Sequence, residues 1–82
     1  MKKLFVGSLA WATTDDTLKS HFEQAGTVAS AKVITDRESG RSRGFGFVEF
    51  ENDNEGDAAI EKLNNSELDG RTITVNEARP RD

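Results

Sequence analysis

Hydrophobic and polar residues alternate in four short stretches of this chain. The stretches are Lys3–Leu9, Val28–Thr35, Arg43–Phe50 and Arg71–Ala78. A period of two is typical of β-strands, because successive side chains point to opposite faces of a sheet. The third stretch is apolar on both sides: Phe45 and Phe47 lie on one, and Val48 and Phe50 lie on the other. We therefore predict four strands, the third of which has to serve two different surfaces.

Two stretches with helical periodicity separate these strands. The first follows Thr14, whose hydroxyl can cap a helix and which precedes two aspartates, and it ends before Gly26. The second begins near Asn52 and extends past Leu63, with Gly56 inside it costing about 1 kcal/mol relative to alanine. The resulting order is β-α-β-β-α-β.

This order predicts a ferredoxin-like (split βαβ) α+β sandwich, in which two helices cover one face of a four-stranded antiparallel sheet. The expected core consists of Leu4, Val6, Ala31, Val33, Val48, Phe50, Ile73 and Val75 from the strands and Leu18, Phe22, Ile60 and Leu63 from the helices. The other face stays open, and Phe5, Phe45 and Phe47 point to it. An exposed aromatic cluster on a small monomer usually marks a binding surface. We expect one domain over residues 1–80, followed by a short tail, 81–82.

Composition narrows the function. The chain has 82 residues, of which 34% are hydrophobic and 32% are charged, with one histidine and no cysteine. Disulfides and thiolate metal sites are excluded, and no cofactor, metal or enzymatic activity is expected. With no apolar run long enough for a membrane span and no secretory leader, a cytoplasmic monomer is the plain expectation.

The net charge of −4 argues at first against a nucleic-acid partner. However, the two predicted helical segments carry seven of the acidic residues and only two lysines, so together they have a charge of −5. The rest of the chain is therefore at +1, and the open face of the sheet is the less acidic side. Binding of nucleic acid with few phosphate contacts and modest affinity is compatible with this distribution.

The stretch Arg43–Phe50 reads Arg-Gly-Phe-Gly-Phe-Val-Glu-Phe and resembles the octamer of the RNA-recognition-motif (RRM) family at every specified position. The family's hexamer resembles Leu4–Leu9, with Ser8 where asparagine is common. The resemblance covers nearly the whole chain. It is greatest to single-RRM glycine-rich RNA-binding proteins of plants and cyanobacteria and to cold-inducible RNA-binding proteins, which often carry a Gly/Arg-rich tail.

The resemblance implies binding of single-stranded RNA by base stacking, in post-transcriptional regulation or RNA chaperoning. The residues expected to bind RNA are Lys3, Phe5, Lys32, Arg43, Phe45, Phe47, Asn76 and Arg79. By resemblance, Phe5 and Phe45 each stack a base, and Phe47 contacts a sugar or lies between two nucleotides. Arg43 contacts phosphate or a base edge, and the residues at the end of the fourth strand read base edges. For the two lysines, an RNA contact and a purely solvated position are both open.

Several alternatives remain at this point. The domain could serve as a protein–protein interaction module, or its acidic helical face could hold a protein in addition to RNA. Single-stranded DNA is a second candidate ligand, and a nuclear location applies if the source is eukaryotic. Trp11 either packs on the first helix or reaches the RNA from its loop, and His21 is expected on the surface.

Overall fold

The computed structural model describes residues 2–35, 38–40 and 42–78. Its strands and helices, in chain order, are β1 Lys2–Gly7, α1 Asp15–Phe22, β2 Val28–Thr35, β3 Ser42–Phe50, α2 Asp53–Leu63, β4 Glu67–Leu68, β5 Arg71–Thr72 and β6 Thr74–Glu77. The predicted order is therefore present, with one addition: a two-stranded hairpin, β4–β5, between α2 and the last strand.

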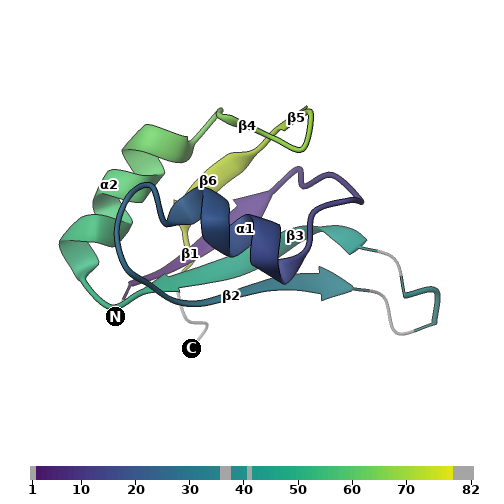
Figure 1. Cartoon of the computed structure of the whole chain (residues 1–82), viewed down its shortest axis with the longest axis horizontal. Coiled ribbons are helices and arrows are strands. Elements are labelled where there is room, and N and C mark those ends of the chain that lie inside the picture. The colour runs from purple at the N-terminus through teal and green to yellow at the C-terminus, as the bar shows by residue number, and fades with distance from the viewer. Residues whose placement is uncertain (1, 36–37, 41, 79–82) are drawn as a thin grey trace.

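The main sheet has the strand order β2-β3-β1-β6, and each neighbouring pair is antiparallel. Both helices lie over the same side of this sheet (Figure 1). In the part of the chain that the structure describes, neither helix covers the other side. The predicted ferredoxin-like α+β fold is confirmed.

The core lies between the sheet and the two helices. Its buried apolar residues are Leu4, Val6, Leu9, Leu18, Phe22, Val28, Val33, Val48, Phe50, Ala59, Leu63, Leu68, Ile73 and Val75. The predicted core set is confirmed except at Ala31 and Ile60, which are only partly buried and pack against its margin. Sequence periodicity missed four members, among them Leu68, which the short hairpin brings into the core.

The prediction of one continuous strand over 71–78 was wrong. The chain reverses at Asp69 and Gly70, which have φ angles of 53° and 80°, so residues 71–72 pair with β4. The strand β6 begins only after Ile73, whose backbone N–H and C=O bind the Ser66 carbonyl and the Asn65 N–H, each at 2.9 Å. Asp69 and Gly70 therefore form the turn of the separate hairpin β4–β5, instead of simply preceding the last strand of the sheet.

Capping fixes the start of α1 and also ties it to the edge of the sheet. Thr14 and Thr17 form a reciprocal capping box, in which each hydroxyl accepts a hydrogen bond from the other residue's backbone N–H, at 3.3 Å and 2.9 Å. Asp15, the residue after Thr14, accepts a hydrogen bond from the Val33 N–H of edge strand β2 at 2.7 Å. Its carboxylate therefore stabilises the N-terminus of α1 and also satisfies a backbone donor of the edge strand.

The expected surface position of His21 needs correction, because its ring is half-buried and hydrogen-bonded. Its Nε2 lies 2.9 Å from the Ser66 hydroxyl oxygen, and the Gln24 side-chain amide lies 3.3 Å from its Nδ1. Burial lowers the pKa of His21, although the negative charge of Asp69 acts in the opposite direction. The histidine therefore links α1 to the segment that follows α2. No helix among the described residues is both long and apolar enough to cross a membrane.

Candidate functional site

The open face of the main sheet carries a row of four side chains, one from each of its four strands. Lys32 of β2 is opposite Phe47 of β3, which is opposite Phe5 of β1, which in turn is opposite Asn76 of β6. Lys32 and Asn76 are exposed, and the two phenylalanines are half-buried. The sheet register thus places two aromatic rings between a cation and an amide.

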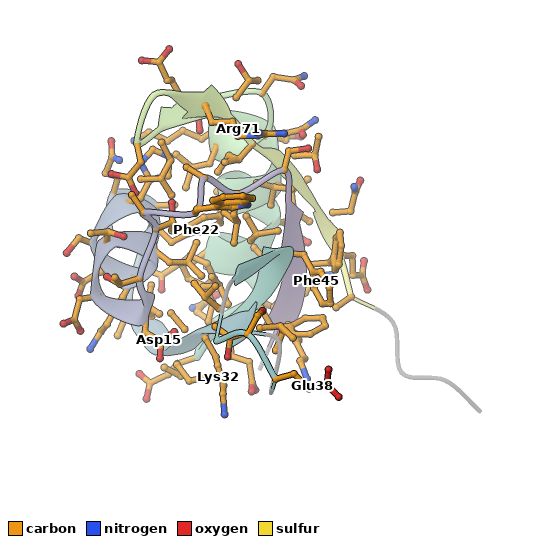
Figure 2. The ribbon with its side chains drawn as sticks, turned by 90° about the vertical axis from the view of Figure 1, so that its right-hand side faces the viewer. Asp15, Phe22, Lys32, Glu38, Phe45 and Arg71 are labelled. Atoms are coloured by element: carbon orange, nitrogen blue, oxygen red, sulfur yellow. The ribbon has the colours of Figure 1, made fainter. Side chains whose placement is uncertain are left out.

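A third ring joins this row from the neighbouring position on β3. Phe45 stands opposite Gly7 of β1, and its ring centroid is 5.6 Å from that of Phe5 with an interplanar angle of 27°. Phe47 is edge-on to both, at 5.9 Å and 68° to Phe5 and at 6.2 Å and 85° to Phe45. We call Phe5, Phe45 and Phe47 the aromatic platform. Figure 2 shows Phe45 on the side of the sheet opposite Asp15 of α1.

Lys3 lies directly over one ring of the aromatic platform. Its Nζ is 4.7 Å from the centroid of Phe47, a distance at which the ammonium is attracted to the face of the ring. Lys3 is also opposite Glu49 in the β1–β3 register, and the Ser30 hydroxyl donates to Glu49 Oε1 at 3.5 Å. The positive charge next to the aromatic platform is therefore partly balanced by an adjacent carboxylate.

Two glycines shape the surface around the rings. A Cβ on Gly7 would lie 2.9 Å from Thr74 Oγ1 and 3.1 Å from Phe5 Cε1, so the absence of a side chain there makes room for the Phe5 ring. A Cβ on Gly46 would lie 2.5 Å from the Lys32 carbonyl oxygen of β2. Gly46 therefore allows the backbone of the adjacent strand β2 to lie close to β3.

The structure brings six of the eight predicted binding residues onto one face. These are Lys3, Phe5, Lys32, Phe45, Phe47 and Asn76. The backbone of Arg43 lies in β3, but its side chain is outside what the structure describes, and Arg79 lies outside the described residues altogether. Their contribution to binding stays a prediction.

Acidic residues accompany the helices on the other side of the molecule. Acids occupy the first turn of both helices, Asp15 and Asp16 in α1 and Asp53 and Glu55 in α2, as capping chemistry favours. Within residues 2–35, 38–40 and 42–78, no group of three His, Cys, Asp or Glu side chains could hold a metal ion. The described side chains of the open face offer aromatic rings for stacking, an amide for hydrogen bonding and two lysines for contacts with anions.

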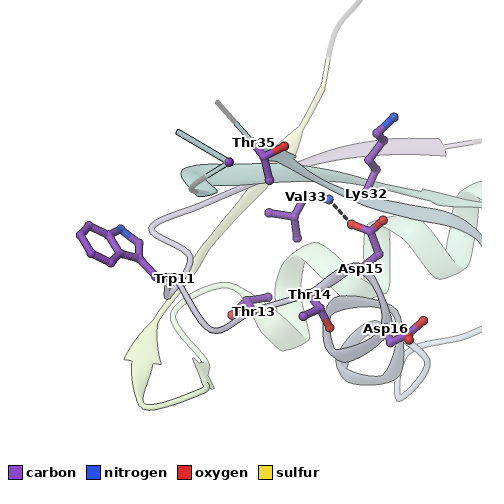
Figure 3. Close-up of a pocket in the computed structure, with 9 residues that line it drawn as sticks. Trp11, Thr13, Thr14, Asp15, Asp16, Lys32, Val33 and Thr35 are labelled. Carbon is purple, nitrogen blue, oxygen red and sulfur yellow. Dashed lines mark hydrogen bonds between the residues drawn. The ribbon is translucent and has the colours of Figure 1, made fainter. Parts of the chain in front are cut away.

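Sequence reasoning left one residue near this face undecided. Trp11 is 73% exposed, so most of its ring is in solvent instead of packed on α1. It also lines a hollow beside β2 (Figure 3). The aromatic character of a loop residue was visible in the sequence, but its position relative to the sheet depends on the turn that follows β1.

A four-stranded sheet with helices on one side and accessible aromatic rings on the other defines a class of small single-stranded nucleic-acid-binding domains. Residues 4–74 match the family model of the RNA recognition motif. The chain belongs to the RNA recognition motif family.

Plant proteins are among its similar relatives. The chain is 58% identical over 79 residues to glycine-rich RNA-binding protein 8 of Arabidopsis thaliana and 56% identical over 79 residues to a glycine-rich RNA-binding protein of Daucus carota. These alignments cover 96% of this chain but 47% and 50% of the two relatives. The chain therefore spans about half the length of these relatives, and the resemblance to glycine-rich RNA-binding proteins is confirmed over that half.

Solved structures agree with the fold. The crystal structure of the RNA-binding protein PG1 superposes with a TM-score of 0.92 at 46% identity, covering 100% of this chain and 99% of that one. The second RRM domain of the yeast poly(U)-binding protein Pub1 superposes with a TM-score of 0.89 at 32% identity, with the same coverage.

Proposed function

We propose that this domain binds single-stranded RNA by stacking bases on the aromatic platform. The observation that carries the proposal is the angle of 27° between the rings of Phe5 and Phe45, which turns their faces in nearly the same direction. Unstacked bases of a single strand present flat faces that can lie on such rings, each contact contributing about 1–3 kcal/mol. Family membership and the names of the relatives support RNA as the ligand.

Phe47 has a different role in this proposal. Because it stands at 68° and 85° to the other two rings and lies beneath the Lys3 ammonium, it is not arranged as a third parallel platform. Its edge-on ring suits a sugar or the space between two nucleotides. Lys3 and Lys32 then flank the path of the backbone and attract phosphate.

Affinity should be modest and only weakly dependent on salt. Single strands lose about 0.7 in the logarithm of the binding constant, per tenfold rise in salt, for each phosphate that is neutralised. The described part of the open face offers few cations, mainly Lys3 and Lys32, and Glu49 lies beside the first of them. Most of the binding free energy is therefore assigned to stacking.

A set of Phe45 variants tests this proposal. Phe45→Leu keeps apolar volume but removes the flat ring, so we expect it to lose most of the affinity for RNA oligonucleotides in a calorimetric titration. Phe45→Tyr keeps a ring and should bind nearly as well as the wild type. In NMR titrations of the wild type, amide shifts should concentrate on β1 and β3.

The opposite pattern would favour the other reading of the domain. If amide shifts were confined to α1 and α2, and Phe45→Leu bound RNA normally, the sheet face would not be the binding site. Use as a protein-interaction module would then gain support. The three accessible rings do not favour that alternative, because a sheet used only for protein contacts has no need of a base-stacking surface.

The finer expectations are part of the same proposal. We infer that the domain acts as a monomer, that single-stranded DNA is a second ligand, and that a protein partner uses the acidic helical face. The RNA recognition motif is not a known enzyme class, and we infer no catalytic activity. A cytoplasmic location and a role in post-transcriptional regulation or RNA chaperoning stay predictions.

A further inference from the structure

We propose that Glu49 determines which base the open face prefers, and that this base is guanine. The inference rests on the proposed RNA binding and concerns a residue to which stacking gives no role. Glu49 is a half-buried acid on the face that carries the aromatic platform. A carboxylate there that accepted nothing from the ligand would only weaken binding, because it repels phosphate. The neighbours of Glu49 indicate a different role.

Glu49 belongs to a second row across the open face, two residues along the strands from the row that contains the rings. The members of this row are Ser30 of β2, Glu49 of β3, Lys3 of β1 and Ala78 of β6, whose N–H donates to the Lys3 carbonyl at 2.9 Å. Two residues of a strand span roughly 7 Å. One edge of a base that stacks on Phe5 can therefore face Lys3 and Glu49.

The carboxylate of Glu49 is available to a ligand. The Ser30 hydroxyl lies 3.5 Å from its Oε1, which is longer than the roughly 2.5–3.0 Å usual for O–H···O hydrogen bonds. Lys3 is opposite Glu49, but its ammonium lies over the Phe47 ring, and no ion pair joins Lys3 to Glu49 in the part of the chain that the structure describes. Both carboxylate oxygens can therefore still accept hydrogen bonds.

Guanine offers such a carboxylate more donors than the other bases do. A carboxylate only accepts hydrogen bonds, and single-stranded RNA exposes the Watson–Crick edges of its bases. On guanine the N1–H and the 2-amino group are adjacent, so the two oxygens can accept from them side by side, as they do from arginine. Adenine and cytosine each present one amino group next to a ring nitrogen that is an acceptor. Uracil presents one N–H between two carbonyl oxygens, which a carboxylate repels.

Lys3 complements the same edge of guanine. The O6 atom, an acceptor, is next to the N1–H on that edge. An ammonium has three donors, so Lys3 can donate to O6 while it also attracts a phosphate. Because Lys3 is directly opposite Glu49, the donor and the acceptor stand side by side, as the guanine edge requires. The positive charge of Lys3 also reduces the repulsion between Glu49 and the RNA backbone.

Single-base changes in an RNA oligonucleotide test this proposal. We would measure, by fluorescence anisotropy, the affinity of uridine heptanucleotides whose central base is guanine, hypoxanthine, adenine, cytosine or uracil. The wild type should bind the guanine oligonucleotide about 5- to 150-fold more tightly than the all-uracil one, the equivalent of one bidentate contact. Hypoxanthine lacks the 2-amino group and should lose most of this gain. Glu49→Gln replaces one acceptor oxygen by a donor, so it should abolish the preference for guanine over hypoxanthine.

Two further variants separate base preference from charge and from stacking. Glu61→Gln removes the same charge from an exposed position of α2, on the covered side of the sheet (Figure 1), and should keep the preference for guanine. Phe45→Leu should weaken binding of all five oligonucleotides and leave the ratio between guanine and uracil unchanged, because it removes a stacking ring and not the carboxylate.

The possible failures of this proposal and of RNA binding differ. Equal affinity of the wild type for all five oligonucleotides, with Glu49→Gln tightening every one to the same extent, would assign only repulsion to Glu49 and leave RNA binding intact. A preference for adenine or cytosine that disappears in Glu49→Gln would overturn the choice of guanine. If none of the five bound the wild type, the proposed RNA binding would fall together with this inference.

Discussion

The two faces of the same strands differ more than their sequences do. On β3, Phe47 and Phe50 are the same residue type three positions apart. Phe50 is 0% exposed and packs against Phe22 of α1, with ring centroids 6.4 Å apart. Phe47 is half-buried, with its ring edge-on to its aromatic neighbours and Lys3 above it. Alternation along the strand sends one ring to the core and the other to the binding face.

This difference shows that apolar character alone does not decide burial. The two helices of the described residues lie over the same side of the sheet (Figure 1), and Phe50 packs on that side against Phe22 of α1. The face with Phe47 is partly protected by contacts among its three rings and by the Lys3 ammonium over one of them. Burial of the helix-covered face, with Phe50, stabilises the fold, whereas the open face, with Phe47, keeps apolar surface available for a ligand.

Truncating one ring from each face should give the largest contrast. Phe50→Ala leaves a cavity in the core and should lower the free energy of unfolding by about 3–5 kcal/mol. Phe47→Ala removes ring contacts worth on the order of 1 kcal/mol and should leave the domain folded. Chemical denaturation followed by circular dichroism measures both.

The effects of the two sites on RNA binding should have the reverse order of their effects on stability. Phe47→Ala should remain folded but bind RNA more weakly. The folded fraction of Phe50→Leu, a milder substitution in the core, should bind RNA normally. Equal stability losses for the two alanine variants would mean that the open face is as much a part of the core as the covered one. That result would remove the contrast between the faces.

A glycine on the helix-covered side gives an intermediate effect. Gly56 of α2 is buried against β1, and a Cβ there would lie 2.5 Å from Lys2 Cγ and 2.6 Å from Lys2 Cβ. The Lys2 ammonium binds Asp57 at 3.0 Å and Glu77 at 3.2 Å, so the stem cannot move without disturbing these ion pairs. Gly56→Ala should therefore destabilise the domain by on the order of 1 kcal/mol, although alanine is the better helix former by about the same amount.

The cause can be isolated by measuring Gly56→Ala in a second background. In Lys2→Gly the obstructing atoms are gone, and the same substitution should become stabilising because only helix propensity remains. Asn54→Ala, at an exposed position in the same helix, is the matched control and should be neutral or stabilising. Stabilisation by Gly56→Ala in the wild-type background would show that the contact between α2 and β1 accommodates the added methyl group.

Much of this architecture was predictable from sequence, because it depends on local patterns. Period-two alternation located the four strands of the sheet, and Thr14 and Gly26 bracketed the first helix and its following turn. The inward and outward sets followed once the helices were counted. The aromatic platform was predictable for the same reason, since Phe5, Phe45 and Phe47 had to share the face that two helices could not cover.

The remaining features depend on contacts that alternation along a single strand does not reveal. The break between β5 and β6 accompanies the backbone hydrogen bonds of Ile73 with Asn65 and Ser66. The position of Trp11 depends on the Thr13–Asp69 hydrogen bond across 56 residues. The burial of His21 depends on Ser66 in the same way, so an isolated polar residue on a helix appeared to be a surface residue.

The smallest expected effect comes from that histidine, a polar residue at the margin of the covered side. The Ser66 hydroxyl donates to the Leu63 carbonyl at 2.6 Å, so it accepts from His21 and the ring proton is on Nε2. Nδ1 is then free to accept from Gln24. A second proton on Nδ1 would break that contact and place charge in a half-buried site.

Burial holds the pKa of His21 below its ordinary value of 6.5. The unfolded chain therefore binds the proton more readily, so stability is full above about pH 6.5 and falls as the pH drops toward the folded-state pKa. We expect the wild type to lose more stability than His21→Gln between about pH 7.5 and about pH 5.5, an interval that lies above ordinary carboxylate titration. Urea denaturation of both proteins at the two pH values measures this difference. Identical pH dependence would show that the margin of the covered side is as well hydrated as the open face.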